Sequence, residues 1–214
     1  MSGHHVSTIH EDYEARQILI FQHALQEFCV KGYEGTSISS IASSVGVSEA
    51  LLYKHVKGKQ ELLYRAIALG YEDEFRLALE EVEAWGGEGP HAKKLEAFIR
   101  AHVLRWSCNP AFHLLYFHES RKPKTQFTSL LAEKSRQYFN LLEGILREGA
   151  QSGEFMLIED IPLACDIIIG GIDQALWWRA ERKLHIDTDE IFPKICNIYM
   201  RTFLKEQDHS VISL

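Results

Sequence analysis

A run of hydroxyl, phenol and ammonium groups lies within residues 36–59. Its members are Thr36, Ser48, Tyr53, Lys54, Lys57 and Lys59. Such groups, together with helix N-termini, hold the phosphate oxygens of nucleic acid. Three lysines oppose one glutamate within this run, whereas the whole chain of 214 residues has a net charge of −7. The pattern therefore predicts a small local DNA contact and argues against a protein that coats nucleic acid non-specifically.

Two short helices joined by a tight turn must position these groups. Apolar residues recur at helical spacing over 37–45, where Ala42 lets a second helix approach closely. Gly46 supplies the turn, and Ser48 is expected to cap a second helix that reaches about His55. Such a pair is a helix-turn-helix, whose second helix enters the major groove of DNA. The alternative is a plain helical hairpin inside a bundle.

Helical periodicity extends over the rest of the chain. The first helix is expected to end at Lys31 and Gly32, a basic last turn followed by a cap glycine. Long helices are predicted over 59–85, 91–107, 110–121, 124–151, 161–183 and 189–206. With 46% hydrophobic residues and no strand alternation, the composition and pattern predict an all-α fold.

The segment from Ile18 to Leu62 resembles the DNA-binding domain of the TetR (tetracycline repressor) family of transcriptional regulators. The likeness rests on Ala24-Leu25, Phe28, Gly32-Tyr33, Thr36-Ser37-Ile38, Ile41-Ala42, Gly46-Val47-Ser48, Leu52-Tyr53, Lys59 and Glu61-Leu62. Val56 and Glu49 depart from the usual family residues. The resemblance implies an N-terminal three-helix helix-turn-helix domain over 10–58. It also implies a C-terminal helical ligand-binding and dimerisation domain over 59–207.

The resemblance also implies where DNA contacts lie. Phosphate contacts are expected from Thr36, Ser48, Tyr53 and Lys59. Base edges are expected near Glu49, Ala50, Leu51 and Lys54, where a lysine can bond guanine and apolar groups can meet thymine methyls. His55 is included in the same surface. The alternative for Tyr53 is a half-buried packing residue.

The last two predicted helices carry apolar stripes suited to dimerisation. One helix-turn-helix makes few contacts, so such domains usually bind two half-sites as a dimer. Gly170 and Gly171 lie in mid-helix, where a partner helix crossing closely would compensate their cost. The expected interface residues are Ile168, Gly171, Ile172, Ala175, Ile195 and Tyr199. Family members dimerise through these helices as a four-helix bundle; the alternative is a core within one chain.

The middle helices are rich in aromatic residues interleaved with histidines, a composition suited to an apolar ligand cavity. The candidate lining is Phe98, His102, Trp106, Phe112, His113, Tyr116, Phe117, Arg121 and Tyr138. A basic cluster of Arg121, Lys122 and Lys124 could receive the phosphates of a coenzyme A ester. The segments YFNLLEGILREGAQSGEF and DIIIGGIDQALWW resemble the acyl-CoA-responsive branch of the family. The alternative is that the aromatic residues form an ordinary core.

The sequence thus predicts a ligand-responsive regulator, most simply a repressor, that binds a palindromic operator as a homodimer. A small hydrophobic effector, in particular a long-chain acyl-CoA, is expected to release it. No cofactor, metal site or membrane segment is expected, and the chain is expected to be cytoplasmic. The four cysteines are far apart and are expected to be buried, reduced thiols. No catalytic constellation appears, and the alternative functions are a helical adaptor or an enzyme on the same fold.

Overall fold

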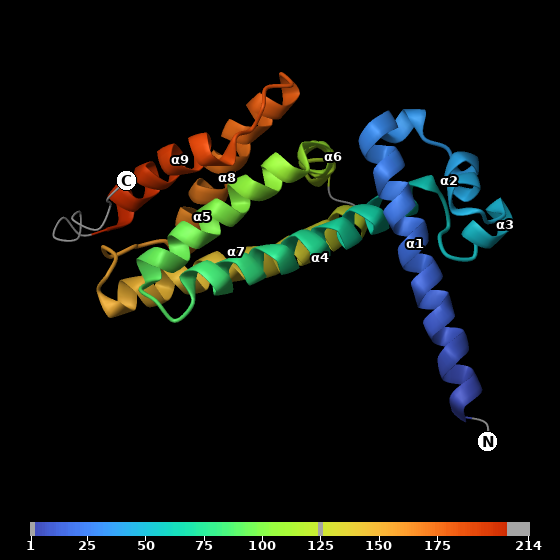
Figure 1. Cartoon of the computed structure of the whole chain (residues 1–214), viewed down its shortest axis with the longest axis horizontal. Helices are drawn as coiled ribbons and strands as arrows, with labels where there is room; N and C mark the ends of the chain where they lie inside the picture. The colour runs from blue at the N-terminus through green and yellow to red at the C-terminus, as the bar shows by residue number, and fades with distance from the viewer. Residues whose placement is uncertain (1–2, 124–125, 205–214) are drawn as a thin grey trace. The chain divides into compact units, whose positions relative to one another are not determined.

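The structure is a computed structural model that describes residues 3–123 and 126–204, with side chains described for 13–123 and 128–204. The described residues form helices and no named strands. The helices are α1 (Gly3–Gly35), α2 (Ile38–Val45), α3 (Glu49–Leu52), α4 (Lys59–Gly86), α5 (His91–Cys108), α6 (Pro110–Ser120), α7 (Gln126–Ser152), α8 (Ile161–Glu181) and α9 (Thr188–Phe203). Figure 1 follows them from the blue N-terminus to the red C-terminus. The all-α prediction is confirmed.

The chain divides into two compact units that are described separately. The head unit comprises residues up to Asp73 together with Leu115–Lys134. The body unit comprises Glu74–Leu114 and the residues from Ser135 onward. Helices α4, α6 and α7 each contribute residues to both units. The predicted division at residue 58 therefore differs from the division by contacts, because the first turns of α4 pack with the helix-turn-helix.

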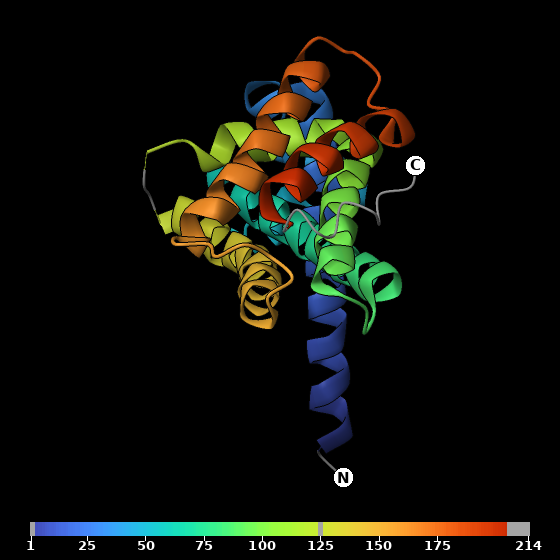
Figure 2. The same cartoon turned by 90° about the vertical axis from the view of Figure 1, so that its left-hand side faces the viewer.

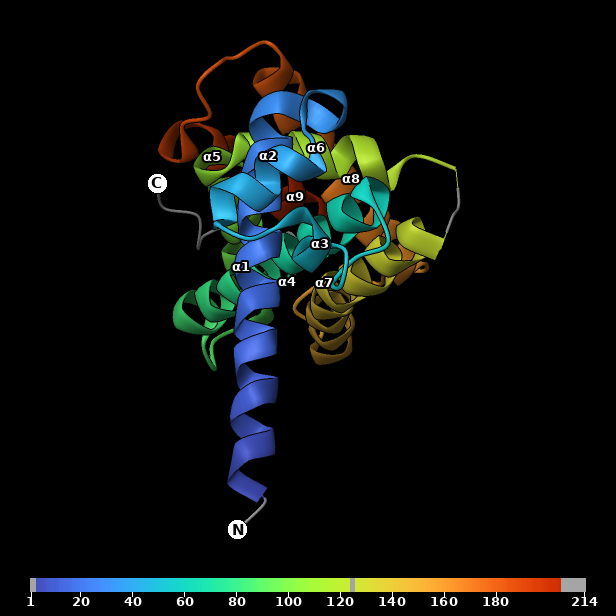
Figure 3. The ribbon, with the colours of Figure 1, turned by 90° about the vertical axis from the view of Figure 1, so that its right-hand side faces the viewer.

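In the head unit, α2 packs on α1 and α3 packs on α2, as Figure 3 shows. The first helix is interrupted at Gly32, whose φ of 69° is left-handed, which confirms the expected helix end there. The core of the head unit contains Phe28, Ile41 and Leu52, each at most 1% exposed. These apolar residues come from three helices, so the short α3 is held by tertiary packing rather than by its own length.

In the body unit, α5 packs against both α8 and α9, whose ribbons lie in front of it in Figure 2. The largest fully buried side chains here are Trp106, Tyr138, Phe98, Phe112 and Phe155. The predicted bounds of the long helices agree with the structure to within three residues. Proline and glycine breakers fixed those bounds, since they end helices locally.

Candidate functional site

Local capping orders the helix-turn-helix. The Ser37 hydroxyl accepts a hydrogen bond from the Ser40 backbone N–H, and the Ser40 hydroxyl accepts one from the Ser37 backbone N–H in return. Gly46 ends α2 with φ 75° and ψ 32°. The Ser48 hydroxyl then accepts from the Leu51 N–H at 3.2 Å. These caps confirm the predicted turn and the predicted Ser48 cap, and they hold α3 at a defined angle to α2.

One side of α3 is open to solvent. Ser48, Glu49, Ala50, Tyr53 and Lys54 are exposed, and Leu51 is half-buried. Tyr53 has 51% of its surface exposed, which fits the half-buried packing role considered for it and still leaves surface open for a DNA contact. The surface offers hydroxyl, phenol and ammonium groups beside two small apolar ones, a mixture that can hold phosphate and meet base edges.

Lys59 stands at the first position of α4, as predicted. Its Nζ lies 4.2 Å from the centroid of the Tyr33 ring, a cation–π contact that orients the side chain. The preceding backbone is also ordered, because the Lys57 N–H donates to Glu61 Oε2 at 2.8 Å. This hydrogen bond is the main reason that the pKa of Glu61 is lowered. The start of α4 therefore presents its lysine from an ordered backbone.

Two predicted DNA-contact residues are buried, and their assignment is wrong. Thr36 is 2% exposed, and its hydroxyl donates to the Gly32 carbonyl at 2.8 Å. His55 is 6% exposed and stacks on the ring of Tyr13 with centroids 4.4 Å apart. Burial, with a smaller effect of Arg16, lowers the pKa of His55. Both side chains support the fold of the head unit from inside.

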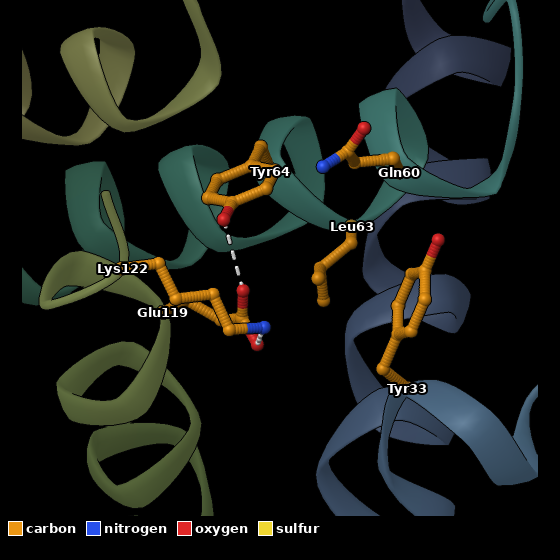
Figure 4. A pocket seen from close by; sticks show the side chains of 6 residues that line it. All are labelled: Tyr33, Gln60, Leu63, Tyr64, Glu119 and Lys122. Carbon is orange, nitrogen blue, oxygen red and sulfur yellow. Dashed lines mark hydrogen bonds and ion pairs between the residues drawn. The ribbon is translucent and has the colours of Figure 1, made fainter. Parts of the chain in front are cut away.

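A small polar hollow of about 70 Å³ lies in the head unit (Figure 4). It is lined by Tyr33, Gln60, Leu63, Tyr64, Glu119 and Lys122. Glu119 is buried and accepts two hydrogen bonds, from the Tyr64 hydroxyl at 2.9 Å and from Lys122 Nζ at 2.6 Å. Burial, with Glu119, raises the pKa of Tyr64. The end of α6 is thereby tied to the second turn of α4.

The predicted basic cluster is largely engaged within the head unit. Arg121 lies over the Phe117 ring and donates to the Phe117 carbonyl at 3.3 Å, while Lys122 is paired with Glu119. Lys124 lies outside the described residues. The cluster therefore offers less free positive charge than its sequence suggests.

The nine predicted ligand-lining residues are divided between the two units. Tyr116, Phe117 and Arg121 belong to the head unit, and Tyr116 packs on Tyr71. The other six belong to the body unit and are buried: Phe98, His102, Trp106, Phe112, His113 and Tyr138. Their rings contact one another, with the Phe98–Tyr138 centroids 4.7 Å apart and the Trp106–His113 centroids 4.8 Å apart. In the structure these six side chains form core, which was the alternative interpretation.

A chain of buried hydrogen bonds crosses this core. His102 Nδ1 lies 2.7 Å from the Tyr138 hydroxyl, and His102 Nε2 lies 2.9 Å from Asp173 Oδ1. Trp106 Nε1 donates to the same carboxylate oxygen at 2.9 Å. The Arg105 guanidinium, which can only donate, lies 3.1 Å from His102 Nδ1. The His102 proton is therefore on Nε2, where it faces the carboxylate.

Burial determines the ionisation of this chain. It lowers the pKa of His102, and the carboxylate of Asp173 opposes this effect only in part. Burial alone would raise the pKa of Asp173, but hydrogen bonds from His102 and Trp106 outweigh it and the pKa is lowered. The pair is therefore a neutral imidazole that donates to an ionised carboxylate. No local residue pattern points to Asp173, because its partners lie 71 and 67 residues away.

A second, larger hollow of about 380 Å³ lies between α4 and α5 in the body unit. It is lined by Glu74, Leu77, Ala78, Glu80, Glu81, Ala84, Ala101, Leu104, Arg105 and Cys108. None of the nine predicted ligand residues lines it. Cys108 is exposed, contrary to the expectation that the cysteines are buried. The feature of the sequence that relates to this hollow is its small residues, Ala78, Ala84 and Ala101, which leave space between α4 and α5.

The predicted dimer surface needs correction at two positions. Ile168 and Ile172 are 0% and 1% exposed within the chain itself, so they are core residues that no partner can contact. On the same helix, Leu163, Ile167 and Trp178 are about half exposed. Gly171 and Ala175 are exposed, and on α9 Ile198 is exposed while Ile195 and Tyr199 are half-buried. The outward face of α8 therefore includes the predicted Gly171 and Ala175 and excludes the predicted Ile168 and Ile172.

The requirement for glycine at 171 also has an explanation within the chain. A Cβ there would collide with the hydroxyl of Tyr199 on α9. That hydroxyl donates to the carbonyls of Ile167 and Ile168, each at 3.2 Å. The Tyr199 hydroxyl therefore gives a reason within the chain for a glycine at 171.

Metal sites and membrane spans are both absent from the described residues. No three of their His, Cys, Asp or Glu side chains converge as a metal site would require. None of the helices within 3–123 and 126–204 is long and apolar enough to cross a membrane.

Comparison with known proteins gives family matches to both parts of the chain. Residues 20–66 match the model described as bacterial regulatory proteins, tetR family, and residues 88–201 match the tetracyclin repressor-like C-terminal domain. A fatty acid metabolism regulator protein of Bacillus subtilis (strain 168) is 29% identical over 158 residues, which cover 73% of this chain and 79% of that protein.

Solved structures share the fold. The transcriptional regulator FadR from Bacillus subtilis in complex with stearoyl-CoA has a TM-score of 0.74 at 23% identity, covering 84% of this chain and 95% of that one. AibR in complex with isovaleryl coenzyme A and operator DNA has a TM-score of 0.66 at 19% identity, covering 86% and 97%.

Proposed function

Because this chain belongs to the TetR family of bacterial regulatory proteins, we propose that it is a repressor that binds a palindromic operator and dissociates from it when a long-chain acyl-CoA binds. The observation that carries the DNA-binding part is the open face of α3. Ser48, Tyr53 and Lys54 are exposed there, on a helix whose caps and buried Leu52 fix its orientation.

Each exposed group has a role in this proposal. Ser48 and Tyr53 hold phosphates, and Lys59 adds a phosphate contact at the start of α4. Lys54 reads guanine at O6 or N7, while Ala50 and Leu51 contact thymine methyls. Glu49 stands on the same face and accepts from cytosine N4 where the sequence offers one. The face therefore combines positioning and base-reading groups.

The operator is palindromic because the active species is a homodimer. Leu163, Ile167 and Trp178 on α8 and Ile198 on α9 expose apolar surface, of the kind that marks association sites. Two copies would bury these stripes against each other. Their recognition helices would then enter successive major grooves about 34–36 Å apart.

The effector is proposed from the relatives. The Bacillus subtilis relative is named a fatty acid metabolism regulator protein, and the similar solved structure of FadR is a complex with stearoyl-CoA. Helix α4 connects the parts of the chain, since it contributes Lys59 to the head unit and Glu74 to the body unit. An effector that favours a body conformation incompatible with the half-site spacing must weaken operator binding.

The experiment uses the full chain and operator DNA obtained by in vitro selection. We expect the selected sequence to be a palindrome and stearoyl-CoA to release the labelled duplex, followed by fluorescence anisotropy. Free CoA at the same concentration is the control and should leave the complex intact. A chain that selects no sequence and shows no salt-dependent DNA binding would instead be a helical adaptor, and the proposal would be wrong.

A further inference from the structure

The hollow between α4 and α5 has the size and walls of a site for an apolar ligand. Its volume of about 380 Å³ lies within the usual range for small-molecule sites, about 300–1,000 Å³. Leu77 and Ala84 on α4 face Ala101 and Leu104 on α5 across it. Since α4 and α5 form a helical hairpin, the hollow is a groove that runs along both helices.

One end of this groove is polar and incompletely bonded. Glu74 Oε2 lies 3.6 Å from Arg105 Nε and 3.6 Å from His113 Nε2, distances too long for hydrogen bonds. All three atoms are buried and make no hydrogen bond. Buried polar atoms in folded proteins nearly always have a partner, so three of them at one point indicate room for another polar atom. Arg105 itself is 8% exposed and lines the groove.

The charges around the groove select the kind of polar atom. The Arg105 Nε–H can only donate, so the incoming atom must accept a hydrogen bond. Glu74 lines the groove beside Arg105, while Glu80 and Glu81 on its wall are paired with Arg76 and Arg100. A free carboxylate placed there would lie beside a buried carboxylate, which is unfavourable at low dielectric. A neutral carbonyl oxygen accepts the same hydrogen bond without that repulsion.

We propose that the α4–α5 groove binds an acyl chain joined to a neutral carbonyl, as in a thioester, and rejects the corresponding free fatty acid. This inference rests on the proposed function, because it takes this groove to be the effector site. The chain lies between Leu77 and Leu104 and extends toward Ala84 and Ala101, with the carbonyl oxygen at Arg105. The headgroup leaves the groove beside Cys108, which is exposed.

The polar end of the groove is bonded to the helix that carries the proposed dimer surface. Arg105 Nη1 donates to the Glu74 carbonyl at 3.1 Å, and Arg105 Nη2 lies 3.1 Å from His102 Nδ1. His102 continues the chain to Asp173, which lies on α8. A carbonyl that draws Arg105 toward the groove therefore alters the bonds that fix α8. The same site thus explains both recognition and its transmission.

Cys108 provides a direct test in the unaltered protein. Maleimide labelling at Cys108 is followed by peptide mass spectrometry with stearoyl-CoA, stearate or free CoA present. We expect stearoyl-CoA to slow labelling about tenfold at a concentration that occupies about nine sites in ten, and stearate and free CoA to leave it unchanged. Unchanged labelling with bound stearoyl-CoA would overturn the placement.

Variants test the two halves of the groove separately. Leu104→Trp fills it, and calorimetry should show an affinity for stearoyl-CoA reduced about tenfold or more. The matched control is Gln151→Trp, at an exposed position on α7 that lines neither hollow, which should bind as the wild type does. Circular dichroism confirms that both variants are folded. If Leu104→Trp binds stearoyl-CoA normally, the groove is not the effector site.

Glu74→Gln tests the selection against carboxylate. It removes the charge while it keeps the shape, so the ratio of the stearate affinity to the stearoyl-CoA affinity should rise about tenfold. A loss of structure alone would not move the two ligands in this selective way. If stearate already binds the wild type as tightly as the thioester, the neutral-carbonyl assignment is wrong. If stearoyl-CoA binds here but does not release operator, the proposed function fails while this binding site stands.

Discussion

The head and body units distribute polar groups in opposite ways. In the head unit the helix-turn-helix exposes hydroxyl, phenol and ammonium groups, and its buried carboxylate, Glu119, has two hydrogen bonds. In the body unit His102 is buried and bonded to the partly buried Asp173, whereas Ile167 and Ile198 are 58% and 64% exposed. The first arrangement suits a charged polymer as partner. The second suits an apolar partner surface and a ligand that completes a buried site.

The two hollows sharpen the contrast. In the small head hollow, Tyr64, Glu119 and Lys122 bond to one another. In the larger body hollow, Glu74 and Arg105 each present a buried atom without a hydrogen bond. A polar network whose hydrogen bonds are all made rigidifies its surroundings. A network with unpaired buried atoms instead gains free energy when a further hydrogen-bond partner binds. The head hollow therefore suits a rigid link between α4 and α6, and the body hollow suits the binding of a ligand.

The largest effect is expected from Asp173→Ala. This change leaves His102 Nε2 and Trp106 Nε1 buried without an acceptor. Each of these two donors, once left without a hydrogen-bond partner, should lower the free energy of unfolding by about 1–3 kcal/mol. Urea unfolding followed by circular dichroism measures it. Asp173→Asn, which keeps one oxygen as acceptor, is the control and should cost less; equal stability of all three proteins would contradict the network.

Neighbouring isoleucines on α8 should respond in opposite ways. Ile168→Ala removes buried methyl groups and should lower the free energy of unfolding by about 2–5 kcal/mol. Ile167→Asp adds a charge to the proposed dimer surface and should shift sedimentation toward monomer, with loss of operator binding. A dimer that is unaffected by Ile167→Asp would show that this stripe is not the interface.

Two lysines of the head unit should separate base reading from phosphate binding. Lys54→Ala is expected to relax base preference by about 1–3 kcal/mol at one position. Lys59→Ala should weaken binding to all sequences and lower the salt slope of the affinity by about 0.9. Anisotropy titrations at several salt concentrations distinguish the two. Unchanged affinity in both variants would refute the placement of the recognition helix.

The head network predicts a smaller effect. Tyr64→Phe removes one hydrogen bond to Glu119, and the expected loss is about 1 kcal/mol of unfolding free energy. More informative is the coupling: stearoyl-CoA should release operator less effectively from this variant while it binds with unchanged affinity. A variant that releases operator as the wild type does would show that this hydrogen bond carries no coupling.

The pH dependence should be the mildest effect near neutrality. Burial lowers the pKa of His102 in the folded protein, whereas a histidine in the unfolded chain has an ordinary pKa of about 6.5. The unfolded chain therefore takes up a proton first as the pH falls, and the stability that His102 contributes is full above that pH and decreases below it. From pH 7 to pH 6 the decrease is up to about 0.7 kcal/mol. His102→Gln should reduce the slope in urea unfolding experiments; a slope that rises instead would contradict the sign.

Local signals predicted the head unit well, and long-range pairings limited the rest. Ser37, Gly46 and Ser48 act on backbone within a few residues, so their types alone predicted the turn. The burial of His55 depends on Tyr13, which is 42 positions earlier, and no spacing rule connects them. The exposed and buried isoleucines at 167 and 168 differ only in which side of α8 meets α5, a fact set by tertiary packing.

The proposed effector groove could not have been found from residue types. Aromatic residues predicted a pocket lining, but large rings fill space, and in the body unit they pack as core. The hollow instead arises where alanines on α4 and α5 leave room. Its polar end joins Glu74, Arg105 and His113, which are far apart in sequence and differ in charge.

The most direct test of the central claim is reciprocal coupling between operator and acyl-CoA. Operator affinity is measured with and without saturating stearoyl-CoA, and stearoyl-CoA affinity with and without operator. We predict that both affinities fall by the same factor, within the typical range of about 5–150-fold, because the coupling free energy is shared. A stearoyl-CoA that binds tightly but changes operator affinity by less than about twofold would contradict the account.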